Sequence, residues 1–213
     1  MIVAIHRVNQ KNLPFMLFGV GLPQLAGLAG EAKSYAERLF DFPVIGSLDR
    51  QQAAEVLTVP AADLGVEYSP EALEILIDHT EGYPYFLQEW GYHLWNYATG
   101  NPISADDARA VVPLVLDRLD RNFFLVRLDR LTPKEKEYLK AMADLGSGPH
   151  RSGDIAAKLG VRVESVAPRR SALIGKGMIY SPAHGDTAFT VPLFDEFLHR
   201  AMRGPGRARP GRR

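Results

Sequence analysis

The sequence predicts a mainly helical protein that begins with a short α/β segment and ends with a helix-turn-helix and a β-hairpin. Three observations support this. Two short, continuous apolar runs flank a helical run near the N-terminus, as in a parallel sheet. Capped helices with periodic apolar positions fill residues 48–112. Two short helices followed by two strand-like runs lie near the C-terminus.

Composition restricts the class of protein. The chain has 213 residues, 46% of them hydrophobic and 23% charged, which is typical of a globular protein of one or two domains. The absence of cysteine excludes disulfides, a thiol nucleophile and Cys-ligated metal sites. The N-terminus lacks the pattern of a signal peptide, and no apolar stretch approaches the ~20 residues of a membrane helix. We therefore expect a soluble, cytoplasmic protein that has no membrane partner.

The formal net charge of zero conceals an asymmetry between the two halves of the chain. Residues 1–115 hold 6 Lys/Arg and 14 Asp/Glu, a balance of −8. Residues 116–213 hold 19 and 11, a balance of +8. This split predicts two parts with different partners.

The N-terminal segment, residues 1–47, is predicted to be a remnant of an α/β core. Residues 15–20 and 42–45 have the apolar composition of two parallel-type strands, and residues 34–40 indicate a short helix between them. Two strands cannot form a sheet that buries both faces. We therefore expect this segment to expose apolar surface unless a partner protein or an upstream segment covers it.

Residues 48–112 are predicted to form four helices. The first begins with a capping box of Asp49 and Gln52 and ends at Pro60. The second begins at Ser69-Pro70, and the third begins at Pro84. The fourth begins at Ser104 and is interrupted or kinked by Pro113.

The remainder of the chain is predicted to contain a connector helix at 113–130 and a winged helix at 131–202. The winged helix would comprise helices near 132–142, 152–160 and 165–176, strands at 178–180 and 187–191, and a last helix at 192–202. Residues 203–213 contain no large apolar residue and are predicted to be a disordered basic tail.

Several catalytic patterns are missing from the printed sequence. It contains no G-x-x-x-x-G-K-[ST] phosphate loop and no apolar strand that ends in Asp-Glu. The six histidines lack metal-ligand spacing, and there is no nucleophile elbow. We predict no metal site and no hydrolysis by these residues alone.

Three runs and the winged helix nevertheless occur in a distinctive order. The runs extend from Leu13 to Pro23, from Ser34 to Phe40 (Ser-Tyr-Ala-Glu-Arg-Leu-Phe) and from Gly82 to Gln88 (Gly-Tyr-Pro-Tyr-Phe-Leu-Gln). This order resembles the C-terminal two-thirds of AAA+/STAND-type P-loop ATPases with an origin-recognition-like architecture. The resemblance implies a partial AAA+ core, a helical lid and a winged helix over residues 1 to about 200. The phosphate loop and the catalytic acid would then lie upstream of Met1, as in a truncated gene, a misassigned start or an excised fragment.

The resemblance also implies roles for individual residues. Residues 15–20 look like the sensor-1 strand, although they lack its polar residue. Arg38 would be an arginine finger that stabilises charge on a transferring phosphate; the alternative is an exposed helix arginine paired with an acid. Gly82-Tyr83-Pro84 looks like the Gly-x-Pro lid motif that packs on the adenine, although a glycine that ends one helix before a proline that begins the next needs no ligand. ATP or ADP with magnesium is the cofactor of the intact family, but we expect this chain alone to bind nucleotide weakly and not to turn over ATP.

In a winged helix, the third helix would enter the DNA major groove. The candidate DNA contacts are Arg162, Arg169, Arg170, Lys176 and His184. The basic tail, which begins at Arg200, could neutralise phosphates without sequence preference. Two alternatives remain: that this winged helix docks a protein, and that the tail is only solvated. The aromatic residues between Tyr83 and Tyr97 favour a lid core over a platform for stacking bases.

The sequence therefore favours the C-terminal part of an ATP-binding AAA+/STAND-type regulatory ATPase, a lid plus a winged helix. The alternative is a stand-alone winged-helix protein that binds DNA or docks a protein.

Overall fold

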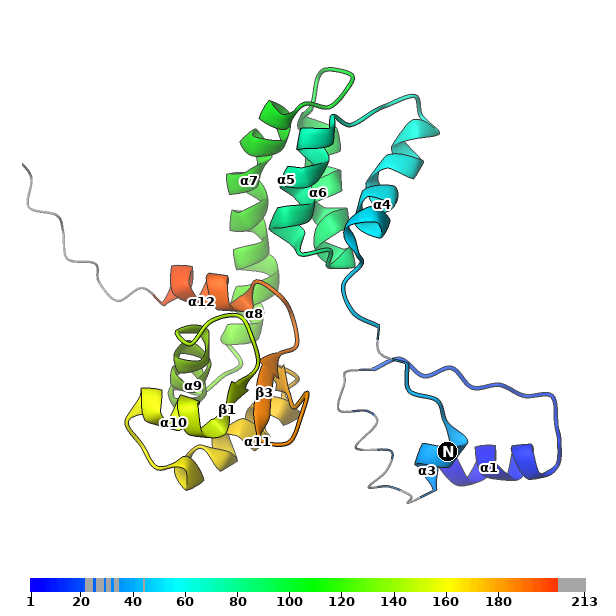
Figure 1. The fold of residues 1–213 in the computed structure, drawn as a ribbon, viewed down its shortest axis with the longest axis vertical. Helices are drawn as coiled ribbons and strands as arrows, with labels where there is room; N and C mark the ends of the chain where they lie inside the picture. The colour runs from blue at the N-terminus through cyan, green and yellow to red at the C-terminus, as the bar shows by residue number, and fades with distance from the viewer. Residues whose placement is uncertain (22–24, 26–28, 30–31, 33–34, 44, 203–213) are drawn as a thin grey trace, which may run out of the picture. The chain divides into compact units, whose positions relative to one another are not determined.

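The computed structural model describes residues 1–21, 25, 29, 32, 35–43 and 45–202. The chain divides into two compact units. One comprises residues 1–45 and 147–191, and the other comprises residues 46–146 together with the segment that begins at Pro192. In the described parts the protein is mainly helical and has one small antiparallel sheet (Figure 1).

The predicted N-terminal strands are absent from the described residues. The segment contains α1 (Ile2–Gln10) and α3 (Ala36–Leu39), whereas residues 15–21 form no regular secondary structure and neither do 40–43 and 45. Val44 and Ser34, which were included in the predicted strand and helix, lie outside the described residues. The strand prediction was wrong because an apolar run becomes a strand only where another strand can pair with its backbone groups.

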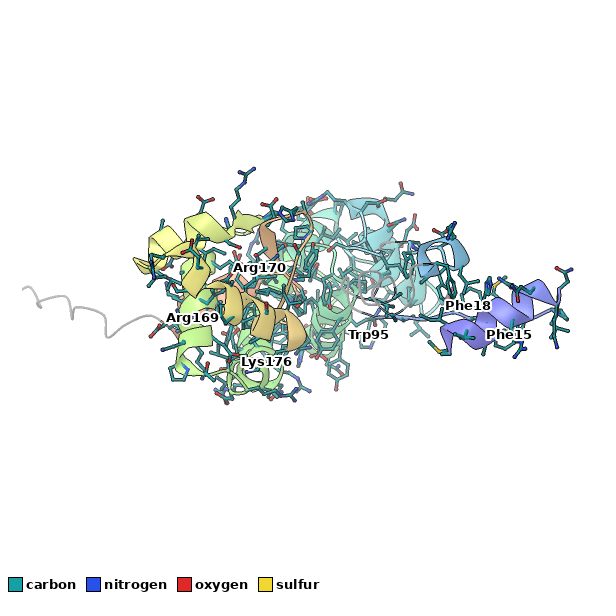
Figure 2. All side chains as sticks on the ribbon, turned by 90° about the horizontal axis from the view of Figure 1, so that it is seen from below. Phe15, Phe18, Trp95, Arg169, Arg170 and Lys176 are labelled. Atoms are coloured by element: carbon teal, nitrogen blue, oxygen red, sulfur yellow. The ribbon has the colours of Figure 1, made fainter. Side chains whose placement is uncertain are left out.

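Apolar side chains in this segment are exposed, as the sequence predicted. Phe15 is 58% exposed, Phe18 84% and Val20 95%. Figure 2 labels the two phenylalanines on the irregular segment that follows α1. An apolar run without a partner strand therefore leaves its side chains in contact with solvent.

Four helices form the first part of the other unit: α4 (Arg50–Ala62), α5 (Pro70–Thr80), α6 (Pro84–Tyr97) and α7 (Ala105–Leu119). The predicted caps are confirmed at Asp49, Ser69 and Ser104. Helix α4 continues two residues past Pro60, so the prediction that this proline ends the helix was wrong. Pro60 lies in the last turn, where the missing N–H removes a single bond and propagates no break. Helix α7 likewise runs through Pro113 without interruption.

The core of these four helices contains part of the predicted aromatic cluster. Phe86 and Trp90 are fully buried, beside aliphatic side chains from α5 and α7. Tyr92, Trp95 and Tyr97 are 62%, 40% and 50% exposed, because they lie on the other side of α6. The prediction of an aromatic core therefore holds for one face of the helix only.

The predicted connector is a continuation of α7. A π-helical turn, η1 (Asp120–Phe124), joins α7 to α8 (Leu125–Leu128). Helix α9 (Pro133–Ala143) follows the predicted start near 132 and is capped by the Thr132 side chain. The last helix, α12 (Phe194–Ala201), packs on α9 and η1.

Residues 147–191 form a small body of helices and strands. Their order is β1 (His150–Arg151), α10 (Ser152–Leu159), the 3-10 turn η2 (Val163–Ser165), α11 (Ala167–Gly175), β2 (Ile179–Tyr180) and β3 (Asp186–Phe189). The sheet is antiparallel in the order β1-β3-β2 (Figure 1). Within the described residues, no helix is both long enough and apolar enough to cross a membrane.

Candidate functional site

The Gly82-Tyr83-Pro84 turn joins α5 to α6 and is closed by the chain's own backbone. The Leu48 N–H donates to the Gly82 carbonyl at 2.9 Å. Gly82 has φ +67°, and a Cβ placed there would lie 2.2 Å from the Leu48 carbonyl oxygen. The turn therefore requires glycine for both its conformation and its space, while Pro84 begins α6 at the exposed surface.

Arg127 interacts electrostatically with Tyr83 of this turn, and the sequence interpretation did not single it out. Burial lowers the pKa of Arg127, an effect that the nearby Tyr83 opposes. The Arg127 guanidinium lies 3.7 Å from the centre of the Phe123 ring and donates to the Phe123 carbonyl oxygen at 2.9 Å. The Leu48 carbonyl oxygen thus occupies the space over Gly82, and Phe123 engages Arg127. The adenine contact that the resemblance implies for Gly82-Tyr83-Pro84 stays a prediction.

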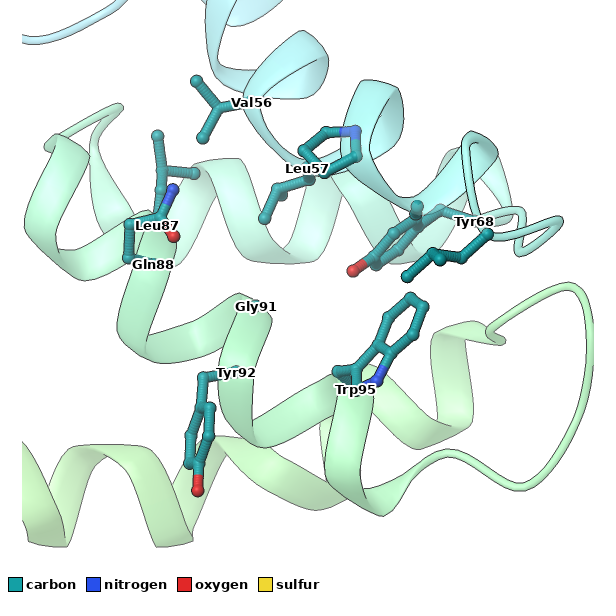
Figure 3. A pocket seen from close by; sticks show the side chains of 11 residues that line it. Val56, Leu57, Tyr68, Leu87, Gln88, Gly91, Tyr92 and Trp95 are labelled. Carbon is teal, nitrogen blue, oxygen red and sulfur yellow. The ribbon is translucent and has the colours of Figure 1, made fainter.

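Helices α4 and α6 enclose an apolar groove of about 310 Å³ (Figure 3). Gly91 allows the helices to approach closely, since a Cβ there would lie 2.9 Å from a Leu57 methyl group. Tyr68 and Trp95 lie at one end of the groove, and burial raises the pKa of the Tyr68 phenol. The signal in the sequence that could have indicated this groove is Gly91, a glycine among the apolar residues of α6. The other lining residues are Val56, Pro60, Ala61, Leu64, Leu87, Gln88 and Tyr92.

Arg38, the predicted arginine finger, lies on α3 and is exposed. It belongs to a different unit from the Gly82 turn. Its phosphate-contacting role therefore stays a prediction.

The candidate DNA contacts lie on or beside α11. Arg169 and Arg170 are half-buried on the helix, and Lys176 is exposed at its C-terminal end (Figure 2). Arg162 precedes the helix, and His184 lies in the turn between β2 and β3; both are exposed. Residues 147–191 hold six Lys/Arg and three Asp/Glu, a balance of +3. This body is therefore basic, as the sequence predicted for this half of the chain.

Arg170 has a structural role that the sequence did not reveal. Its Nε donates to Thr187 Oγ1 at 3.0 Å, and its Nη2 donates to Ser181 Oγ at 2.8 Å and to the Asp186 carbonyl oxygen at 3.0 Å. Thr187 is fully buried. Arg170 therefore fastens α11 to the β2–β3 hairpin, and any contact with DNA must use the rest of its guanidinium.

A polar hollow of about 340 Å³ lies between α10, η2, α11 and the hairpin turn. It brings Arg170 and His184 together, whereas Arg162, Arg169 and Lys176 do not line it. Three serines complete the polar lining, and no sequence pattern indicated them. The lining residues are Ser152, Val163, Ala167, Arg170, Ser171, Ser181, His184 and Gly185.

Of the predicted basic tail, the structure describes only the beginning. Arg200 is engaged by Asp120, through two hydrogen bonds of 2.9 and 2.7 Å. Residues 203–213 lie outside the described residues. Within the described chain, no group of three or more His, Asp or Glu side chains could hold a metal ion.

Comparison with known families gives one match. Residues 121–198 match a family described as a domain of unknown function, DUF8462. This stretch, from η1 into α12, is less than half of the chain. No curated protein matches the sequence.

Among solved structures, the chain is similar to RuvB of Thermotoga maritima. One RuvB variant matches with a TM-score of 0.46 and 18% identity over 88% of this chain. A RuvB structure described as a Holliday junction branch migration motor matches with a TM-score of 0.35 and 16% identity over 76% of this chain. The chain covers 60% and 51% of the lengths of these two proteins, respectively. TM-scores this low do not establish a common fold.

Proposed function

We propose that this chain carries the helical lid and winged helix of an AAA+/STAND-type regulatory ATPase, and that its winged helix binds duplex DNA through α11. The observation that carries the DNA-binding part is the body formed by residues 147–191. In it, two short helices joined by a turn precede a hairpin, and basic side chains lie along the second helix. In a helix-turn-helix, that second helix is the one that enters the major groove.

The local sequence explains this arrangement. Gly160 has φ +67° and ends α10, η2 forms the turn, and Pro168 lies in the first turn of α11. Arg169 is not among the residues that these hydrogen bonds join, and Lys176 is exposed at the C-terminal end of α11. Each contact between such a cation and a phosphate releases counterions from DNA, so binding would weaken as salt increases.

The test is a fluorescence-anisotropy titration of a labelled duplex with the full chain at several salt concentrations. The double variant Arg169→Gln/Lys176→Gln should bind more weakly, and its plot of log affinity against log salt should be shallower by about two. Arg109→Gln is the matched control, because Arg109 is an exposed arginine on α7 that is paired with Asp106. If the parent chain does not bind at low salt, or if the double variant binds like the control, the DNA proposal fails.

The lid assignment rests on the resemblance at Gly82-Tyr83-Pro84, and the purine contact belongs to the intact ATPase. In the intact ATPase, ATP with magnesium would supply the phosphoryl group, and the resemblance assigns the turn to the adenine rather than to the phosphates. We expect the purified chain alone not to release phosphate from ATP. Steady turnover that Arg38→Ala abolishes would contradict this expectation.

A second candidate function is a winged-helix regulatory protein that docks another protein. The exposed aromatic side chains Tyr92 and Trp95 beside the α4–α6 groove favour it. The two functions differ in salt dependence: contacts with phosphates weaken steeply as salt rises, whereas burial of an aromatic side chain does not.

A further inference from the structure

The polar hollow beside α11 has a chemistry that reading bases in the major groove does not require. We propose that this hollow binds one backbone phosphate of duplex DNA and thereby fixes the position of α11 on the duplex. The inference rests on the proposed DNA-binding function and names a specific site within it.

The polar side chains in the lining are one guanidinium, one imidazole and three hydroxyls, beside the apolar Val163 and Ala167, and the lining contains no carboxylate. The Ser152 hydroxyl already donates to the Gly185 carbonyl oxygen, and the Ser181 hydroxyl donates to the Ala183 and Asp186 carbonyl oxygens. Guanidinium and hydroxyl groups are among the commonest protein contacts to DNA phosphates. A cavity with this lining favours an anion over a cation or an apolar group.

Arg170 provides the positive charge in a fixed orientation. Its hydrogen bonds to Thr187, Ser181 and the Asp186 carbonyl use Nε and Nη2. Nη1 has no hydrogen-bond partner among the described residues. A guanidinium already held in place loses less conformational entropy when it binds a phosphate.

Two further donors lie at the edges of the hollow. Ser171 on α11 and His184 in the hairpin turn are both exposed and line the hollow. Neither side chain has a hydrogen-bond partner among the described residues. They lie on two different elements, so one phosphate bound between them would bridge the helix and the hairpin.

Helix α10 contributes favourable electrostatics. Ser152, its first residue, lines the hollow and donates its N–H to the Gly185 carbonyl oxygen at 3.2 Å, while the N-cap Arg151 provides no side-chain cap for the N–H groups that follow. The first N–H groups of a helix favour a nearby anion.

The carboxylates of the surrounding elements do not line the hollow. The Asp186 carboxylate faces Arg151, with Oδ1 3.9 Å from Nε. Asp154 lies in the first turn of α10, and Glu164 lies in η2; both are exposed. Since none of these carboxylates lines the hollow, none would compete with a phosphate for its donors.

A phosphate held here would have a defined consequence. Contacts with the backbone set the register and orientation of a protein on a duplex but carry no sequence information. The hollow lies beside α11, so occupying it would fix how that helix lies in the groove. The site predicts stronger binding to all duplexes, without sequence preference.

The experiment introduces a carboxylate into the hollow. Ser171→Asp changes an exposed side chain and should weaken binding to a labelled duplex by about tenfold or more, because the new charge repels the phosphate and a donor is lost. Ala157→Asp is the matched control: it adds the same charge to an exposed position on α10 outside the hollow, and it should change affinity by less than about twofold. Thermal melting monitored by circular dichroism verifies that both variants fold.

The double variant Ser171→Ala/His184→Ala separates hydrogen bonding from charge. It should weaken binding by about fivefold to tenfold. It should leave the salt dependence unchanged, since it removes hydrogen-bond donors and no Lys or Arg side chain. The Arg169→Gln/Lys176→Gln variant should reduce the salt dependence instead.

The outcomes distinguish this site from the proposed function. If the parent binds DNA and Ser171→Asp behaves like Ala157→Asp, the hollow is not a phosphate site, although the DNA-binding proposal stands. If the parent binds no duplex, both proposals fall. A titration with inorganic phosphate, followed by NMR at the Ser171 and Gly185 amides, forms a second arm. Saturable shifts in a parent chain that does not bind DNA would assign the hollow to free phosphate and overturn the DNA assignment.

Discussion

Arg200 on α12 donates two parallel hydrogen bonds to Asp120 in the π-helical turn η1, from Nε to Oδ2 at 2.9 Å and from Nη2 to Oδ1 at 2.7 Å. The pair raises the pKa of Arg200. Beside it, the Phe124 and Phe197 rings stack with their centres 5.1 Å apart. An ion pair and a ring stack thus join the last helix to the end of α7. Asp120 and Phe124 are the first and last residues of the π-helical turn, so this turn contributes to both the ion pair and the ring stack.

The first prediction concerns this ion pair. Asp120→Asn removes the charge while keeping the shape of the side chain, and it leaves Glu196, whose carboxylate lies 3.6 Å from the Arg200 guanidinium, as the remaining partner in an ion pair. We expect the free energy of unfolding to fall by about 1 kcal/mol, between the values of exposed and buried pairs, since the two side chains are 31% and 24% exposed. Urea denaturation measures the change. Asp106→Asn, in the exposed Arg109 pair, is the control, and an equal effect from both variants would contradict the prediction.

The second prediction concerns the turn at Gly82. Gly82→Ala places a methyl group 2.2 Å from the Leu48 carbonyl oxygen, so the backbone must move. Gly65→Ala is the matched control, because Gly65 has φ +72° and nothing lies within 4 Å of its Cβ position. The control should cost only the left-handed conformation, about 1 kcal/mol. Gly82→Ala should cost at least about 2 kcal/mol more in the free energy of unfolding, and similar losses in both variants would refute the clash.

The third prediction concerns acid. The hydrogen bond from Lys140, helped by His199, lowers the pKa of Asp144. A carboxyl whose pKa is lower in the folded state stabilises the protein above its unfolded pKa of about 3.9, and the contribution disappears as the pH falls through the folded value. Stability should therefore decline below about pH 4, and Asp144→Asn should make that decline shallower. Denaturant titrations between pH 6 and 2.5 (roughly the window that this pKa shift sets) test this prediction. If stability falls with pH equally in the parent chain and in Asp144→Asn, Asp144 makes no such contribution.

Features that depend on residues close together in the sequence were predicted correctly, whereas features that depend on residues far apart in the sequence were not. Helix starts at Asp49 and Ser104 were predicted correctly because a cap and its partner lie three residues apart. Residues 15–20 have the composition of a buried strand but lack a described partner strand, and pairing is a long-range condition that composition cannot supply. Pro60 was overestimated as a helix terminator, because it lies in the last turn of α4, and α7 runs through Pro113 without interruption.

The candidate site divides in the same way. The basic residues around α11 could be selected from charge and position in the predicted helix. The hollow could not be predicted, because Ser152, Ser171 and Ser181 come together only when the hairpin folds back on α11. The internal hydrogen bonds of Arg170 were likewise hidden, because its partners lie 11 to 17 residues away in the sequence.

The fourth prediction concerns the cap of α7. Ser104 and Asp107 form a reciprocal box: Asp107 N–H donates to Ser104 Oγ at 3.2 Å, and Ser104 N–H donates to Asp107 Oδ2 at 3.0 Å. The Ser104 hydroxyl and N–H also lower the pKa of Asp107. Ser104→Ala removes the hydroxyl, which accepts from the Asp107 N–H and also donates to Asp107 Oδ2 at 2.6 Å, so the free energy of unfolding should fall by about 1 kcal/mol. In the same variant the pKa of Asp107 should rise toward its ordinary value, as NMR titration of the carboxyl carbon would show.

Ser69→Ala is the control, because Ser69 caps α5 without a carboxylate partner. It should lower stability by a similar amount and leave the pKa of Asp107 unchanged. A stability loss in Ser104→Ala without the shift at Asp107 would mean that the hydroxyl is not what holds that carboxylate ionised.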